Sequence, residues 1–123
     1  MEAVADYLES EGVGTIATNL FINKMPNTPV DSIAVNGTGG SQSIPSGLER
    51  PTFQILIRRK DPAEGAATAK EIYDLLHDGW GILGKGWNGR VLATNYHGIY
   101  YRDENNHVVY TLNFVLVKVP DGR

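Results

Sequence analysis

The fold is decided by the stretch Pro51-Thr-Phe-Gln-Ile-Leu-Ile-Arg-Arg-Lys-Asp-Pro-Ala-Glu-Gly-Ala-Ala-Thr-Ala-Lys-Glu-Ile-Tyr-Asp-Leu-Leu76, which predicts a β-strand running directly into an α-helix. Phe53, Ile55 and Ile57 alternate with mostly polar neighbours, the period of two that is typical of a strand with one buried face. Pro51 suits the first position of such a strand, where a missing amide proton costs least. We therefore expect this strand to lie in the core of the sheet.

The helix that follows carries its own start signal. Asp61 is a good N-cap residue, Pro62 fits the first helical position, and Glu64 completes a capping-box pattern. We expect Gly79 to be the residue that ends the helix at its C′ position. The apolar side chains predicted to face the sheet recur at helical spacing and are Ala66, Ala69, Ile72, Tyr73, Leu75 and Leu76.

Composition restricts the class of protein. The chain has 123 residues, with 41% hydrophobic and 20% charged side chains, which predicts a single domain over residues 1–123. The absence of cysteine excludes a disulfide scaffold and a thiolate metal site. The formal charge of −3 argues against a protein that binds nucleic acid over its whole surface. Residues 1–50 are acidic, with six acidic and two basic side chains, whereas residues 51–123 carry eight and nine.

The remaining segments predict a second helix and several strands. We expect a short amphipathic helix over residues 2–10, and strands over 18–22 and 31–36 that together form a hairpin. Residues 37–50 and 79–89 are rich in glycine and are predicted to be long, flexible surface loops. A strand over 90–101, broken near Gly98, a turn over 103–106 and a strong strand over 107–119 complete the chain. That last strand is apolar on both faces, which predicts a central place in the sheet or cover from a neighbouring subunit.

No catalytic, cofactor or metal site is predicted. Residues 79–86 match Gly-x-x-x-x-Gly-Lys of a phosphate-binding loop, but Gly86 replaces the Ser or Thr that ligates magnesium, and the segment follows a helix instead of a strand. His97 and His107 could face each other across the last hairpin, although ordinary strand positions are the better interpretation. No serine lies in a nucleophile elbow. No stretch is long and apolar enough to span a membrane, and no secretory signal precedes the first helix.

Four features are candidates for contact with partners. Trp80 and Trp87 flank a glycine-rich loop, where they either cap the core or anchor an interface. Gly39 and Gly40 in the first glycine-rich segment, and Asp103 and Asn106 in the predicted turn, are further interface candidates on composition alone. Arg58, Arg59 and Lys60 end the strand of the opening segment, where they are either solvated or in contact with nucleic acid.

Four pieces of the chain form an ordered pattern. They are Leu8-Glu-Ser-Glu-Gly-Val-Gly14 after the first helix, Asn19-Leu-Phe-Ile-Asn-Lys-Met-Pro26, Arg50-Pro-Thr-Phe-Gln-Ile-Leu-Ile-Arg58 with the helix ending in Ile72-Tyr-Asp-Leu-Leu76, and Arg102-Asp-Glu-Asn-Asn-His-Val-Val-Tyr-Thr-Leu-Asn-Phe114. Taken in this order, they resemble the minor capsid and tail-terminator (tail-completion) proteins of long-tailed bacteriophages. The resemblance covers nearly the whole chain. It departs at Tyr96-His-Gly-Ile-Tyr-Tyr101, where a proline-containing stretch is expected.

The resemblance implies an α/β (α+β) domain with two helices packed on a mixed, mainly antiparallel sheet. It implies a structural virion protein, not an enzyme and without a cofactor, that forms a hexameric ring at the head-proximal end of the tail. Such a ring stops polymerisation of the tail-tube protein and joins a head-completion or stopper protein, close to the DNA in the channel. The expected location is the neck of the virion, after assembly in the host cytoplasm. The alternatives are another head-completion or neck protein, or a small non-enzymatic binding module.

Overall fold

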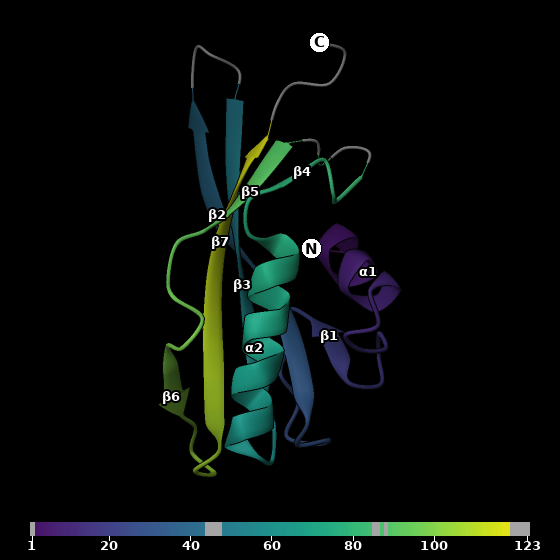
Figure 1. The fold of residues 1–123 in the computed structure, drawn as a ribbon, viewed down its shortest axis with the longest axis vertical. Helices are drawn as coiled ribbons and strands as arrows, with labels where there is room; N and C mark the ends of the chain where they lie inside the picture. Colours follow the sequence, from purple (N-terminus) through teal and green to yellow (C-terminus); the bar gives the residue numbers. More distant parts are fainter. Residues whose placement is uncertain (1, 44–47, 85–86, 88, 119–123) are drawn as a thin grey trace.

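The chain folds into a seven-stranded sheet with two helices packed against one face, as the computed structural model shows for residues 2–43, 48–84, 87 and 89–118 (Figure 1). The elements are α1 (Glu2–Ser10), β1 (Leu20–Ile22), β2 (Ser32–Ser43), β3 (Leu48–Arg58), α2 (Pro62–Leu76), β4 (Gly79–Trp80), β5 (Gly89–Ala93), β6 (Tyr100–Arg102) and β7 (Val108–Lys118). The strand order is β1-β2-β3-β7-β5-β4, and β6 pairs with the other end of β7. All pairs between these strands are antiparallel except β1 with β2. The predicted α+β class with a mixed, mainly antiparallel sheet is confirmed.

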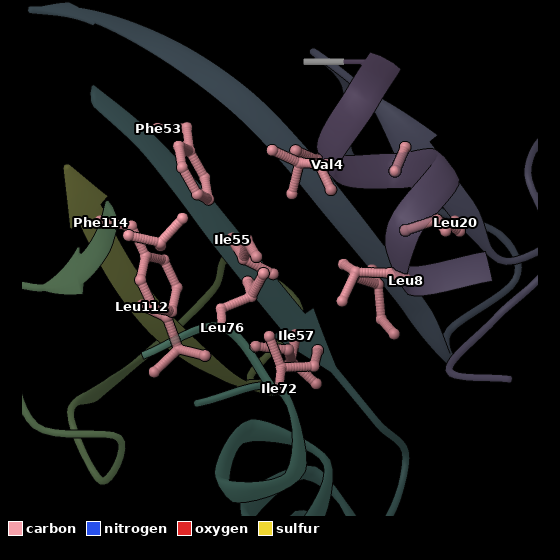
Figure 2. Packing of buried hydrophobic residues seen from close by; sticks show 14 of the residues in the cluster. Val4, Leu8, Leu20, Phe53, Ile55, Ile57, Ile72, Leu76, Leu112 and Phe114 are labelled. Atoms are coloured by element: carbon pink, nitrogen blue, oxygen red, sulfur yellow. The ribbon is translucent and has the colours of Figure 1, made fainter. Parts of the chain in front are cut away.

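The core lies between the helices and the sheet, and the opening segment forms its centre. Phe53 stands opposite Phe114 on β7, and Ile55 stands opposite Leu112. All four side chains are essentially fully buried, and the two phenylalanine rings stack with their centroids 5.2 Å apart. Figure 2 shows how α1 and α2 close this cluster from the same side. Because β7 lies between β3 on one side and β5 and β6 on the other, its predicted central place is confirmed.

Helix α2 begins and ends by local hydrogen bonding. The Asp61 carboxylate accepts from the Ala63 amide at 2.9 Å, which confirms the predicted N-cap. At the other end, His77 is the C-cap and Asp78 takes the left-handed conformation with φ of 65°. The prediction that Gly79 ends the helix is therefore wrong by one residue. Asp tolerates this conformation better than most residues, and its carboxylate is held there by Arg90.

The glycine-rich segment 37–50 was predicted to be a loop, and this prediction is wrong for most of its length. Residues 37–43 continue β2 and residues 48–50 begin β3, with pairing from Gly39 opposite Thr52 to Ser43 opposite Leu48. One irregularity between Gly37 and Gly39 accommodates the weak strand formers, and the Thr38 and Thr52 hydroxyls share a hydrogen bond of 2.7 Å. Pairing with β3 therefore overrides the low strand propensity of glycine and serine. Residues 44–47 lie outside the described part of the chain.

The first two strands do not form the predicted hairpin. β1 and β2 are parallel, with Leu20 opposite Ile33 and Ile22 opposite Val35. The segment between them must therefore cross from one end of the sheet to the other. Arg58 holds this segment by donating to backbone carbonyls within residues 26–30.

The strand predicted over 90–101 is divided into β5 and β6, and the interruption covers residues 94–99. It includes the break predicted near Gly98 but begins earlier, directly after Ala93. There the Asn95 side chain makes hydrogen bonds with β7 that a paired strand would otherwise make. Its amide donates to the Thr111 carbonyl at 2.9 Å, and its oxygen accepts from the Asn113 amide at 2.6 Å. The edge of β7 thus keeps its hydrogen bonds while the 94–99 backbone departs from the sheet. The predicted loop 79–89 likewise contains β4 at its start and reaches β5 at Gly89, and residues 85, 86 and 88 lie outside the described part of the chain.

Candidate interaction surfaces

Arg58 is buried, so the prediction that it takes the chain to solvent is wrong. It donates from Nε to the Val30 carbonyl at 2.8 Å and from Nη2 to the Pro29 carbonyl at 3.0 Å, and it also donates to the Pro26 carbonyl. The remaining nitrogen lies 3.8 Å from the Asp103 carboxylate. Arg58 is thus an internal clamp that joins β3, the segment before β2 and the turn before β7.

The two basic residues after Arg58 lie at the surface in different environments. Arg59 lies between two acidic side chains, 3.5 Å from the Asp31 carboxylate and 2.9 Å from that of Glu64. The Glu64 carboxylate is therefore held by the Arg59 guanidinium. Glu64 lies in the first turn of α2, close to the predicted N-cap residue Asp61. The Lys60 amide donates to Asp31 at 2.7 Å, and its side chain is exposed. Of the three predicted cationic contacts, Lys60 presents the most accessible charge.

The turn 103–106 is ordered around Asp103. The Asp103 Oδ1 atom accepts from the amides of Asn105 and His107, both at 2.9 Å. These backbone hydrogen bonds, led by the one from His107 and helped by the charges of His107 and Arg58, lower the pKa of the Asp103 carboxyl below its usual range, against the effect of burial. Asn106 is exposed and adopts a φ of 62° at the end of the turn, where its amide donates to the Asp103 carbonyl at 2.9 Å. The Asp103 carboxylate thus orders the backbone of the turn, and Asn106 is exposed to solvent.

Trp80 and Trp87 have different environments. Trp80, on β4, is 66% exposed, and the Arg90 guanidinium lies 5.7 Å from the centre of its ring. Trp87 is half-buried and packs against the core. The core-capping interpretation thus describes Trp87, whereas Trp80 is available for contact with a partner.

Gly39 and Gly40 lie in the outer half of β2, where they stand opposite Thr52 and Pro51 of β3. In Figure 1 this part of the hairpin extends beyond the two helices. The glycines therefore belong to a paired strand, and any contact they make would involve the strand surface.

A further group of exposed apolar side chains, not predicted as an interface, lies in the segment before β6 and on β6 itself. Tyr96, Ile99, Tyr100 and Tyr101 are between 48% and 66% exposed, and together with Trp80 they are the exposed large hydrophobic residues of the described chain. We call these four residues the aromatic ridge. The three tyrosines within residues 96–101 are a sequence signal for such a surface. The sequence alone does not show which of these side chains the rest of the fold leaves uncovered.

The ridge is fixed to the body of the protein by further rings. The Tyr100 ring lies 5.6 Å from that of Tyr110 on β7. The ring of His97, beside Tyr96, makes an edge contact with Tyr73 of α2 at 5.2 Å. The ridge is therefore held in place by ring contacts within the chain.

A groove lies between α1 and the segment that follows β4. Its volume is about 510 Å³, and its lining consists of Glu2, Ala3, Asp6, Tyr7, Ser10, Ile82, Leu83, Gly84 and Trp87. The lining combines apolar side chains from both elements with the acidic side chains of Glu2 and Asp6 on α1. We call this feature the α1 groove.

The described residues hold no group of three or more side chains suited to a metal ion. The alternative in which His97 and His107 face each other is wrong, because His107 lies beside Asp103 whereas His97 contacts Tyr73. The preferred interpretation as strand positions is also wrong, since His97 lies between β5 and β6 and His107 directly precedes β7. Of the segment that resembles a phosphate-binding loop, Lys85 and Gly86 lie outside the described part of the chain. No helix among the described residues is long and apolar enough to cross a membrane.

The arrangement consists of a sheet with one helical layer, a protruding hairpin, and exposed aromatic side chains on its flanks. Such exposed side chains on a rigid sheet are suited to contact with other proteins. The chain matches the family model described as bacteriophage tail terminator protein over residues 7–120, and it belongs to that family. No curated protein matches the chain in sequence.

Membership confirms the resemblance found in the sequence. The family is structural and not enzymatic, and its members are components of the virion tail. It also implies interaction with the tail tube.

Proposed function

We propose that this chain forms a ring of six copies at the head-proximal end of the tail, where it ends polymerisation of the tail tube and joins the tail to a head-completion or stopper protein. Family membership over residues 7–120 is the observation that carries this proposal. The fold supports it, because a ring subunit needs a rigid body with different contact surfaces on different sides. The sheet and its buried Phe53–Phe114 stack supply that body.

The described surfaces divide between candidate partners. The exposed Trp80 and the strand surface at Gly39 and Gly40 are candidates for axial contact with the tail tube or the neck, together with Asn106 in the turn 103–106. Aromatic side chains such as Trp80 are enriched among residues that dominate binding energies. Lys60 is the candidate for proximity to DNA in the channel, since Arg58 is buried and Arg59 is paired with Asp31 and Glu64.

The proposal is tested by polymerising the purified tail-tube protein of the same phage with and without this chain. We expect negative-stain images to show tubes of bounded length that carry a ring at one end when the chain is present. Tubes that grow equally long in its presence, with no ring at their ends, would refute the terminator function. Locating the chain in an intact virion by electron microscopy then separates the tail end from other neck positions.

A further inference from the structure

We propose that the ring closes by docking the aromatic ridge of one copy into the α1 groove of the next. The inference rests on the proposed ring and names the two surfaces that would form each of its contacts. The occupant of the groove is therefore a second copy of this chain.

The ridge has the character of a docking surface. Four large side chains from residues 96–101 are about half to two-thirds exposed. Because Tyr100 and Tyr101 are successive residues of β6, they lie on opposite faces of the sheet, so the ridge presents the β6 strand with a ring on each face. The contacts of Tyr100 with Tyr110, and of His97 with Tyr73, hold the ridge in a fixed shape. A prearranged aromatic surface loses little conformational entropy on binding, which favours association.

The α1 groove has the complementary character. Its volume of about 510 Å³ is large enough for more than one side chain, and Ala3, Ile82 and Leu83 contribute apolar surface. Glu2 and Asp6 add negative charge from α1, and both are exposed. A lining that combines these apolar side chains with polar and acidic ones suits tyrosine rings, which carry a hydroxyl group, next to a cation.

The positive charge that would meet these carboxylates is supplied by Arg102, next to the ridge. Arg102 follows Tyr101 directly on β6 and is exposed. Its guanidinium donates to the Asn106 carbonyl at 3.2 Å, which leaves its positive charge uncompensated by that contact. Opposition of Arg102 to Glu2 and Asp6 would fix the register of the contact and exclude a ridge-to-ridge arrangement.

The positions of the two surfaces agree with a ring. In Figure 1, β6 and the 94–99 segment lie on one side of the molecule and α1 lies on the other. A surface that pairs with itself ends at a dimer, whereas two different surfaces on opposite flanks continue from copy to copy and can close into a ring. The ridge and the groove satisfy that requirement.

The test uses the absence of native cysteine. We would prepare Asp6→Cys in the groove, Ile99→Cys on the ridge, and the double variant, and treat each with a short bismaleimide, alone and bound to tail tubes. The double variant should give a ladder of covalent multimers that stops at the ring size. A mixture of the two single variants should give only dimers, and neither single variant should cross-link with itself. Asp6→Cys combined with Glu71→Cys on the exposed face of α2 is the matched control and should give no ladder.

A second measurement removes dependence on the cross-linker. Glu2→Lys and Arg102→Glu should each weaken self-association at least about tenfold, and the two together should restore most of it. Tubes that are terminated normally while Asp6 and Ile99 fail to cross-link would overturn the ridge-to-groove contact and leave the terminator function intact. Cross-linking of Ile99 to the tube protein, or of Ile99 to itself, would overturn it as well. Unchecked tubes together with the expected ladder would refute the terminator function and leave the contact standing.

Discussion

The guanidinium of Arg58 lies 3.8 Å from the carboxylate of Asp103, and both side chains are largely buried, with 4% and 18% of their surface exposed. Through this pair, the end of β3 is connected to the turn that precedes β7. Because Arg58 also donates to carbonyls within residues 26–30, three segments distant in sequence depend on one side chain.

Arg58→Ala should therefore destabilise the fold by on the order of 3 kcal/mol, because it leaves buried carbonyls without donors and Asp103 without its cation. Arg58→Lys should recover only part of this loss, since one ammonium group cannot reproduce the divergent donors of a guanidinium. Urea denaturation followed by circular dichroism measures both. Arg102→Ala, at an exposed arginine, is the control and should change stability by less than about 0.5 kcal/mol. An Arg58→Ala variant as stable as this control would show that the clamp contributes nothing.

The lowered pKa of Asp103 predicts a specific pH dependence. A carboxyl with a lower pKa in the folded state stabilises the fold above its unfolded pKa, near 3.8, and this contribution is lost as the pH falls through the folded value. Asp103→Asn keeps an oxygen that can accept from the Asn105 and His107 amides but removes the charge beside Arg58. The stability difference between wild type and Asp103→Asn should be constant from neutral pH to about pH 5 and should shrink below about pH 4. Urea unfolding across this range is the measurement.

Glu104→Gln is the control for Asp103→Asn, because it removes an exposed carboxylate from the same turn. Its stability difference from wild type should be small at every pH. A difference for Asp103→Asn that does not vary down to pH 3 would contradict the assignment of the lowered pKa to the folded state.

Gly65 in α2 predicts a steric effect. A Cβ atom at this position would lie 3.2 Å from two atoms of the Tyr110 ring, so the helix approaches β7 closely here. Gly65→Ala should be nearly neutral, because a gain in helix propensity of about 1 kcal/mol offsets a small displacement of the ring. Gly65→Leu should cost roughly 2 kcal/mol through overpacking. In a Tyr110→Ala background the cost of Gly65→Leu should fall by more than half, and equal costs in both backgrounds would exclude this contact as the cause.

The sequence predicted those parts of the fold whose local signals agree with each other. β3 was identified by the alternation of Phe53, Ile55 and Ile57, and the start of α2 by the cap at Asp61. Both could be predicted because burial of a strand face and capping of a helix each require particular residue types at fixed spacings. The glycine-rich half of β2 was missed, because its strand conformation comes from pairing with Thr52 and Pro51, residues remote from it in sequence.

Long-range interactions also explain the other errors. The parallel pairing of β1 with β2 depends on a connection that Arg58 holds, and no residue of that connection signals it locally. The break after Ala93 depends on the Asn95 side chain meeting the edge of β7. The aromatic ridge was missed for a related reason, since exposure of Tyr96 and Tyr100 is decided by which elements fail to cover them.

The two tryptophans provide a final prediction that separates stability from assembly. Trp80→Ala should change the free energy of unfolding by less than about 0.5 kcal/mol, because its side chain is exposed and its main contact is with the Arg90 guanidinium at the surface. Trp87→Ala should cost about 2–3 kcal/mol, because Trp87 packs against the core. In tube-polymerisation assays at temperatures where both variants are folded, Trp80→Ala should be the one that yields longer tubes if Trp80 contacts the tube. Normal tube lengths with Trp80→Ala would assign its exposed ring to the neck side or to no partner, and thermal unfolding of each variant provides the check that loss of assembly is not loss of fold.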